Sequence, residues 1–296
     1  MGTKLRVLRR RIRSVQSTMQ ITRAMELVAA SRIARAQQRV EAARPYAELL
    51  TRAMEDIARQ TGSFVHPLLE ERETPERAGV LLVTSDRGLA GSYNASVLRL
   101  AEGLMREIRG RGLKPTVYAC GKKGISYLRF RGVALEGTWS GFSEVPSFSA
   151  AHEIGRRLID DFTERRIDEL HAVYTDFRSA FTLRPTAKRF LPVSPEEVQK
   201  LKGQPHAEYI FEPEPAVILG EMLPLYVIAK VYAALLESAA SENAARRRAM
   251  KSATDNAEGL IKVLTRQANR ARQDEITGEI VEIVGAAEAL VEAVGE

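Results

Sequence analysis

Apolar residues at both ends of the chain recur at the spacing of a coiled coil. In the N-terminal run they alternate steps of three and four residues in one register, interrupted only by Thr22 and Glu26. The positions are Leu5, Leu8, Ile12, Val15, Met19, Ala29, Ile33, Ala36, Val40, Ala43, Ala47, Leu50, Met54 and Ile57. An apolar repeat of about 3.5 residues needs a partner helix along its whole length. We therefore predict a helix over residues 3–60 that packs against a second long helix.

The C-terminal run supplies that partner, with a helix predicted over residues 216–291. Its apolar seam is Met222, Leu225, Ala229, Tyr232, Leu236, Ala239, Met250, Ala253, Ala257, Leu260, Leu264 and Ala271. An antiparallel pairing that brings the polar interruptions together places Glu26 beside Arg246. In that register the helix beyond about Asn269 extends past the N-terminus, and its apolar stripe stays uncovered: Ile276, Ile280, Ile283 and Val284. Such a tip needs a socket in another protein.

Between the two helices the pattern changes to short apolar runs that alternate with amphipathic stretches. Strands are predicted over residues 79–84, 116–120 and 169–175, and helices over 94–109, 122–130 and 148–164. This alternation is typical of a small parallel or mixed α/β layer. A stretch dotted with prolines, residues 185–215, is expected to lead to the last helix.

The predicted fold class is therefore α/β plus a long antiparallel two-helix coiled coil formed by the N- and C-terminal helices. We expect an N-terminal coiled-coil helix over 1–60 and an α/β, Rossmann-like globular domain over 76–195. The C-terminal coiled-coil helix with its projecting tip is expected over 210–296.

Composition limits the partners and kinds of site that the chain could have. The 296 residues carry a net charge of +6, so nucleic acid, an anionic membrane surface or an acidic protein could each be a partner. The single cysteine excludes an intramolecular disulfide, and the four histidines lack the spacing of a metal site. The basic start of the chain lacks the apolar core of a secretory signal. The most apolar stretch, 217–236, contains a glycine, a proline and two charged residues, so no transmembrane span is expected.

A loop over residues 85–94 lies where phosphate loops occur, after a strand and before a helix. It has two glycines, Gly88 and Gly91, but lacks the Gly-Lys-Ser/Thr ending of a P-loop. We interpret it as an exposed contact loop, with Asn94 as a helix cap, rather than as a nucleotide site. No constellation of catalytic, cofactor-binding or metal-ligating residues is predicted anywhere in the chain.

Two basic segments have alternative interpretations. Arg9, Arg10, Arg11 and Arg13 flank the seam, where they either form a solvated face or contact an acidic protein surface. Arg266, Arg270 and Arg272 precede the tip, where they either add solubility or pair with carboxylates of a surrounding protein.

Several segments together resemble the γ subunit of a bacterial F-type ATP synthase, over essentially the whole chain. They are residues 12–17, Gln20-Ile-Thr-Arg-Ala-Met-Glu-Leu-Val-Ala-Ala-Ser31, Ala43-Arg-Pro-Tyr-Ala47, Thr84-Ser-Asp-Arg-Gly-Leu-Ala-Gly91, Val145-Pro-Ser-Phe148, Tyr174-Thr-Asp-Phe177, Met250-Lys-Ser-Ala-Thr-Asp-Asn256, Asn269-Arg-Ala-Arg-Gln273 and Ile276-Thr-Gly-Glu-Ile280.

The resemblance implies a non-catalytic rotor shaft. One γ subunit turns inside a hexamer of three α and three β subunits, also contacts the ε subunit and the c-ring, and couples ion-driven c-ring rotation to ATP synthesis or hydrolysis. It thereby regulates ATPase activity and proton flow through the complex. Nucleotides and magnesium belong to α and β, so this chain is expected to hold no cofactor. Its implied location is peripheral, on the cytoplasmic face of the bacterial cell membrane.

The resemblance also implies roles for individual residues. Contacts with β are expected at Arg23, Met25, Glu26, Arg246, Arg272, Gln273 and Thr277. The bearing tip comprises Ile276, Ile280, Ile283 and Val284. Contacts with ε and the c-ring are expected at Arg87, Gly88, Leu89, Ala90 and Gly91. Ala90 stands where many relatives carry cysteine, and Ser92 where glycine is common.

Two other classes of function stay open on the residues alone. One is a nucleic-acid or phosphate-ligand protein that uses the basic N-terminal helix and the Gly88 loop. The other is a stand-alone enzyme with a pocket at the strand ends of the α/β layer.

Overall fold

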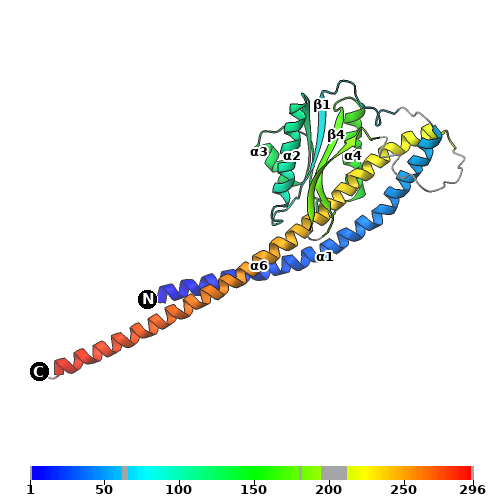
Figure 1. Ribbon diagram of the computed structural model, residues 1–296. Helices are drawn as coiled ribbons and strands as arrows, with labels where there is room; N and C mark the ends of the chain where they lie inside the picture. The colour runs from blue at the N-terminus through cyan, green and yellow to red at the C-terminus, as the bar shows by residue number, and fades with distance from the viewer. Residues whose placement is uncertain (1, 62–65, 180–181, 195–211, 295–296) are drawn as a thin grey trace. The chain divides into compact units, whose positions relative to one another are not determined.

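The computed structural model describes residues 2–61, 66–179, 182–194 and 212–294 (Figure 1). The chain divides into two compact units. The helical unit comprises Met1–Val28 and Arg248–Glu296, and the α/β unit comprises Ala29–Arg247. The predicted domain limits at 60, 76, 195 and 210 differ from this division and stay a prediction.

Two long helices contribute to both units, as the seams predict. Helix α1 spans Gly2–Thr61 and helix α6 spans Pro215–Val294. Pro45 lies inside α1 and Pro224 inside α6, and neither residue ends its helix. Tertiary packing along a long apolar stripe therefore outweighs the cost of a missing backbone hydrogen bond at each proline.

In the helical unit the two helices pair antiparallel, which confirms the predicted coiled coil. Leu8 is buried together with Leu264 and Ala268, and the cluster is extended by partly buried Leu5, Ile12, Val15 and Ala271. Farther along, the Thr22 hydroxyl lies 2.8 Å from the Thr254 hydroxyl in a buried layer. Each seam thus satisfies its polar position with a matching one on the other helix.

The predicted register is wrong: a pairing of Glu26 with Arg246 would place Thr22 opposite Met250, whereas Thr22 pairs with Thr254, four residues further along α6. The seam of α6 runs through Met250, Thr254 and Ala257, while Leu260, predicted to lie in it, is 46% exposed. Alanine-rich seams tolerate several registers, and the buried threonine pair fixes one of them. The predicted Glu26–Arg246 layer is replaced by this pair, since the ion pairs of Arg246 are to Glu242 and Glu144 within the α/β unit.

The α/β unit contains a five-stranded sheet in the order β3-β2-β1-β4-β5. The strands are β1 Arg77–Val83, β2 Lys114–Cys120, β3 Leu135–Trp139, β4 Glu169–Phe177 and β5 Leu183–Leu191. The first four pair in parallel and β5 is antiparallel to β4. The three predicted strands are confirmed, and β3 and β5 are additions.

Strand β5 corrects the expectation of an irregular connection beginning at residue 185. It carries Pro185 opposite Thr175 and three basic residues, Arg184, Lys188 and Arg189, so it lacks the apolar run of a buried strand. Proline and lysine are tolerated there because β5 is an edge strand. Residues 195–211 of the predicted connection lie outside the described residues.

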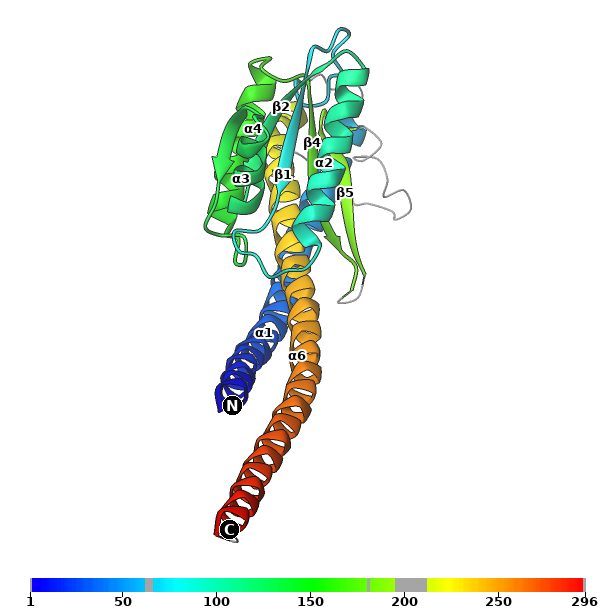
Figure 2. The same ribbon diagram turned by 90° about the vertical axis from the view of Figure 1, so that its left-hand side faces the viewer.

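Helices cover both faces of the sheet. Helix α2 (Tyr93–Gly110) and helix α3 (Lys122–Phe130) pack on one face, and helix α4 (Phe148–Thr163) and part of α6 lie on the other (Figure 1, Figure 2). Close packing of α4 against α6 requires Gly155, where a Cβ would lie 2.7 Å from Ile228. On this face α6 buries Leu223, Val227 and Val231 in the main core.

Helix α6 is the one helix in the described residues with the length and composition needed to cross a membrane. One such helix is weak support for a membrane span, because core helices of globular proteins meet the same criterion. The N-terminal part of α6 is such a core helix, since its apolar side chains pack against the sheet.

Candidate functional site

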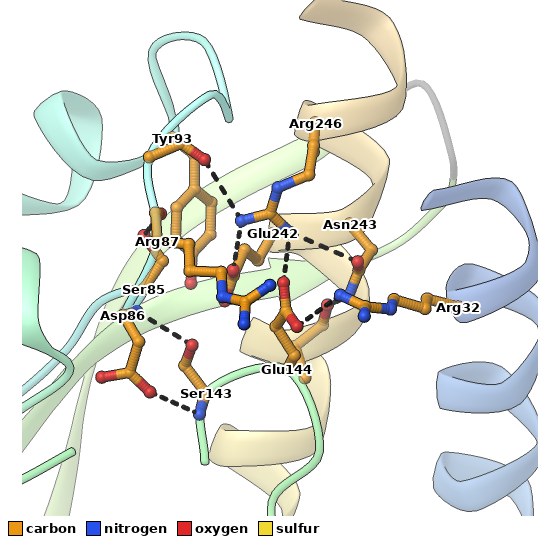
Figure 3. Close-up of polar contacts among 12 residues, drawn as sticks. Arg32, Ser85, Asp86, Arg87, Tyr93, Ser143, Glu144, Glu242, Asn243 and Arg246 are labelled. Atoms are coloured by element: carbon orange, nitrogen blue, oxygen red, sulfur yellow. Dashed lines mark hydrogen bonds and ion pairs between the residues drawn. The ribbon is translucent and has the colours of Figure 1, made fainter. Parts of the chain in front are cut away.

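A buried cluster of charged side chains joins four segments of the α/β unit (Figure 3). Its centre is Arg246 on α6, whose side chain is 5% exposed. One guanidinium nitrogen lies 2.6 Å from Glu242 and donates to the Gly88 carbonyl at 3.3 Å, and the other lies 3.3 Å from Glu144. Glu144 in turn pairs with Arg32 on α1. A single carboxylate thus bridges arginines on two different helices.

The loop that contains Gly88 is held by the carboxylate of Asp86. Its oxygens accept hydrogen bonds from the backbone N–H groups of Lys122, Gly141 and Ser143, at 2.8–3.0 Å. Asp86 therefore ties three connections at the carboxyl ends of β1, β2 and β3. Such charge-assisted bonds to backbone are among the stronger ones in proteins.

The predicted contact loop is partly exposed and partly built into the fold. Arg87, Leu89 and Gly91 are exposed, whereas Ala90 is buried and packs with Tyr93 and Ala245. Leu89 has a φ of 61°, an uncommon left-handed conformation that turns its side chain to solvent. The loop is thus presented in a fixed shape.

Asn94 is not the cap of α2. The helix begins at Tyr93 after Ser92, and the Asn94 amide oxygen instead accepts from the Ser85 backbone N–H at 3.0 Å. This bond closes the base of the loop. The residue is structural, but for a different reason from the one expected.

The carboxyl end of the sheet, where doubly wound folds hold ligands, is filled by the chain itself. Leu235, Ser238 and Glu242 of α6 line this place together with Asp86 and Tyr93, and the remaining cavity measures about 10 Å³. That volume suffices for about one water molecule. A cavity of this volume is too small for a nucleotide or for an enzyme's substrate, the two alternative uses of this end of the sheet.

Burial shifts the pKa of two acids on α6. Burial raises the pKa of Glu242, and the neighbouring Arg246 opposes that shift. Burial, reinforced by the charge of Asp176, raises the pKa of Glu237 to about 7, and Lys188 opposes it. The interface between helix and sheet thus contains two glutamates whose pKa is raised by burial.

The predicted bearing tip is exposed throughout its described part. Ile276, Ile280, Ile283 and Val284 are each between 48% and 68% exposed. With the corrected register Ala271 still packs with the N-terminal helix, so the uncovered stretch begins near Ile276 instead of Asn269. A stripe of this kind on a helix end is an association surface.

The residues predicted to contact β lie in different environments. Arg23, Arg272, Gln273 and Thr277 are exposed, while Met25 and Glu26 are partly buried. Arg246 differs from all of these, because it is buried among its own acids. Its predicted contact with β stays a prediction; its observed contacts are internal.

Sequence reasoning missed Arg32, Glu144 and the role of Asp86. These residues come from three segments far apart in sequence, and charged residues at helix faces and loops are common enough that none stands out. The available signal was the Ser-Asp-Arg-Gly loop, whose aspartate follows directly after a buried strand.

Solved structures of mitochondrial ATP synthases contain chains with the same architecture. A chain from the central stalk and c-ring structure of the Tetrahymena thermophila mitochondrial ATP synthase is 26% identical, has a TM-score of 0.58, and is matched over 99% of its length by 79% of this chain. A chain from the Euglena gracilis mitochondrial ATP synthase, 18% identical with a TM-score of 0.66 over 98% of this chain and 95% of its own, shares the fold. The class defined by fold and surfaces is therefore the central stalk of a rotary ATPase.

Sequence similarity narrows this class to one subunit. Residues 4–290 match the family described as ATP synthase. The "ATP synthase gamma chain" of Acidothermus cellulolyticus is 54% identical over 98% of both chains, and that of Mycolicibacterium smegmatis is 49% identical over 98% and 99%. The chain belongs to the ATP synthase gamma chain family. It is a non-catalytic stalk subunit of a membrane-associated rotary complex that functions in ATP synthesis.

Proposed function

We propose that this chain turns as the shaft of the complex at the cytoplasmic face of the bacterial membrane, with its C-terminal tip as the bearing. Three α and three β subunits would surround the paired helices, and ε and the c-ring would contact the α/β unit. Rotation of the c-ring would then drive the β sites through ATP synthesis, and hydrolysis would drive the reverse.

The exposed apolar tip is the observation that carries this proposal. Five apolar side chains on one helix end stay uncovered by the N-terminal helix: Ile276, Ile280, Val281, Ile283 and Val284. Because each is between 48% and 68% exposed, covering it would contribute about half of the 1.5–3 kcal/mol that full burial of such a side chain gives. An apolar sleeve in the surrounding hexamer would cover them without directional hydrogen bonds, so the contact could persist at every rotational angle.

Polar side chains next to the tip and seam suit the role of contacting β. Arg23 on α1 and Arg272, Gln273 and Thr277 on α6 are exposed donors on the helical unit. Guanidinium groups pair well with carboxylates, so acidic loops of β are fitting partners. Met25 and Glu26 follow Arg23 on α1, are partly buried, and would contact a β loop at the level of Arg23.

The fixed loop around Gly88 suits a contact with ε and the c-ring. Arg87 and Leu89 offer a charged and an apolar side chain on a backbone anchored by Asp86. A preorganised loop loses little conformational entropy on binding.

Truncation before Glu279 tests the bearing. The shortened chain should keep the fluorescence and urea unfolding of Trp139, the single tryptophan, which lies in the α/β unit. Reconstituted with α and β, it should turn with lower torque in a single-molecule rotation assay. Exposed Glu258→Gln, which leaves the tip intact, is the matched control. Full torque from the truncated shaft would contradict the bearing role.

Met25→Lys tests the contact with β. The added ammonium should pair with an acidic loop of β and lower the ATP yield per proton moved, while the midpoint of unfolding changes little. Proton pumping and ATP synthesis in membrane vesicles measure this coupling, with the exposed Ser252→Lys change, which adds the same charge outside the proposed contact set, as control. Unchanged coupling in the Met25→Lys complex would remove Met25 from the proposed interface.

A further inference from the structure

Both long helices pass out of the α/β unit close to the buried charged cluster. The boundary between the two units follows Val28 on α1 and Arg247 on α6. Arg32 and Arg246, the two arginines that Glu144 bridges, both lie within one helical turn or so of these boundaries, on the side of the α/β unit. The bridge therefore joins the helices at the places where each continues from one unit into the other.

The loop that carries Glu144 is fastened to the sheet through the residue before it. Ser143 donates its backbone N–H to the Asp86 carboxylate at 3.0 Å, and its hydroxyl accepts a hydrogen bond from the Asp86 backbone N–H at 2.9 Å. Asp86 itself lies just beyond the end of β1 at Val83. A continuous set of polar contacts thus runs from the sheet through this loop to α1 and α6 (Figure 3).

Arg32 gives α1 a kind of contact that its other positions lack. Among the side chains of α1 that the structure describes, it is the only one in an ion pair. The buried positions around it, Ala29, Ile33 and Ala36, are apolar and mostly small. Apolar packing is non-directional, so these contacts alone would let the helix slide or turn by small amounts. A charge-assisted pair with fixed geometry opposes such movement.

We propose that Glu144 is a positioning residue that locks the sheet of the α/β unit to both helices, so that torque on this unit passes into α1 and α6 together. A shift of either helix would lengthen one of the two pairs that Glu144 makes. Arg246 could not exchange the lost pair for water, because its side chain is 5% exposed, and breaking such a buried pair is costly. This proposal rests on the proposed function as a shaft.

The lock and the bearing tip use opposite kinds of contact. At the tip, non-directional apolar contacts would allow turning against the surrounding hexamer. At Glu144, directional ion pairs with arginines on two helices would prevent turning within the chain. A shaft needs both properties, and this chain has a physical basis for each of them.

Hydrogen exchange of the isolated full chain tests the lock without rotation. Glu144→Gln keeps the size of the side chain and removes the charge that both arginines share. The backbone amides of α1 around Arg32 should exchange about tenfold faster or more, because losing one partner of a largely buried pair lowers the free energy of local opening. Glu136→Gln is the matched control, since Glu136 pairs with Arg157 of α4 instead, and it should leave these amides unchanged. Equal exchange in the two variants would overturn the proposal.

Arg32→Gln tests the same lock from α1, at a side chain that is 35% exposed, so the fold does not depend on its burial. It should speed exchange of the same amides. Combined with Glu144→Gln it should add little, because both changes remove one shared pair. Fully additive acceleration would show that the two side chains act separately and would overturn the lock.

A single-molecule rotation assay measures the mechanical role. With α and β assembled around the chain and a bead attached to the α/β unit, the angular spread of the bead during pauses reports the stiffness of the shaft. Glu144→Gln should widen this spread while the rate of ATP hydrolysis stays near that of the unaltered complex, and Glu136→Gln should widen it no more than the unaltered chain does. Rotation with an unwidened spread in Glu144→Gln would overturn the lock alone. Failure of the unaltered chain to rotate would overturn the proposed function, and the mechanical role with it.

Discussion

The two units of this chain use the same two helices but bury them very differently. In the described part of the helical unit the buried hydrophobic cluster is small, with Leu8, Leu264 and Ala268, while apolar side chains such as Ile21 and Leu27 stay exposed. In the α/β unit the helices pack with the sheet into a large core in which Leu158, Leu223 and Val227 are fully buried. The α/β unit therefore has a core large enough to stabilise its own fold. The helical unit leaves apolar side chains exposed, and these are available for contact with partner subunits.

The contrast predicts different responses to the loss of a buried charge and of core volume. In the α/β unit, Arg246→Ala removes the counter-charge of Glu242 and Glu144 and should cost about 3 kcal/mol or more of unfolding free energy. Exposed Arg247→Ala, one residue further, should cost less than about 0.5 kcal/mol. Urea unfolding followed by Trp139 fluorescence measures both. Similar small losses for the two variants would show that the charged cluster does not hold the unit together.

Removing core volume in each unit compares them directly. Leu158→Ala in the α/β unit should cost about 3 kcal/mol, because its side chain is fully buried. Leu264→Ala in the helical unit, where few other side chains are buried, should cost about 2 kcal/mol, the low end for a buried leucine, and leave the Trp139 transition in place. Far-UV circular dichroism reports the helices, and tryptophan fluorescence reports the sheet. A shift of the Trp139 transition by Leu264→Ala would mean that the units unfold together.

The pH dependence of stability should also differ between the units. The pKa of Glu237 is raised to about 7, so the folded α/β unit binds a proton that the unfolded chain releases near the usual glutamate value. Stability from this group is therefore fully present below that usual value and is lost as pH rises through about 7, by roughly 2 kcal/mol after allowance for partial exposure. Glu237→Gln should remove this decline, in urea midpoints measured from about pH 5 to about pH 8. Exposed Glu258→Gln should keep the decline; its disappearance there would contradict the assignment to Glu237.

The smallest effect concerns the threonine pair that fixes the register of the helical unit. Thr254→Val leaves the buried Thr22 hydroxyl with a single acceptor and should lower stability by about 1 kcal/mol. The double change Thr22→Val with Thr254→Val should recover most of that loss, because both polar groups are gone. Thermal melts of the helical signal measure the cycle. Additive losses in the double variant would show that the two hydroxyls do not interact.

Periodicity was enough to predict the helices and three of the five strands, but not β3, β5 or the register in which the two long helices meet. The seam positions Ile33, Ala36, Met54 and Ile57 are buried as expected, since a repeat of about 3.5 residues is readable in one dimension. The register was not readable, because small alanines fit opposite many neighbours. Strand β5 was hidden by its proline and its basic residues, which only an edge position permits.

Of the candidate functional surfaces, the sequence predicted the apolar tip but not the buried charged cluster. The apolar tip follows from pattern alone, and its start moved from Asn269 to Ile276 when the register was corrected. The bridge from Arg32 through Glu144 to Arg246 depends on three segments that only the folded chain brings together. Pairings of that range leave no local trace in a single sequence.

Helix α6 lies where a doubly wound sheet ordinarily receives a coenzyme, with Leu235, Ser238 and Glu242 set into that crevice. Side chains of this long helix thus occupy the position of a bound coenzyme. A small molecule could bind there only if α6 separated from the sheet, so the packing that joins the helix to the domain also closes the usual ligand site of this fold.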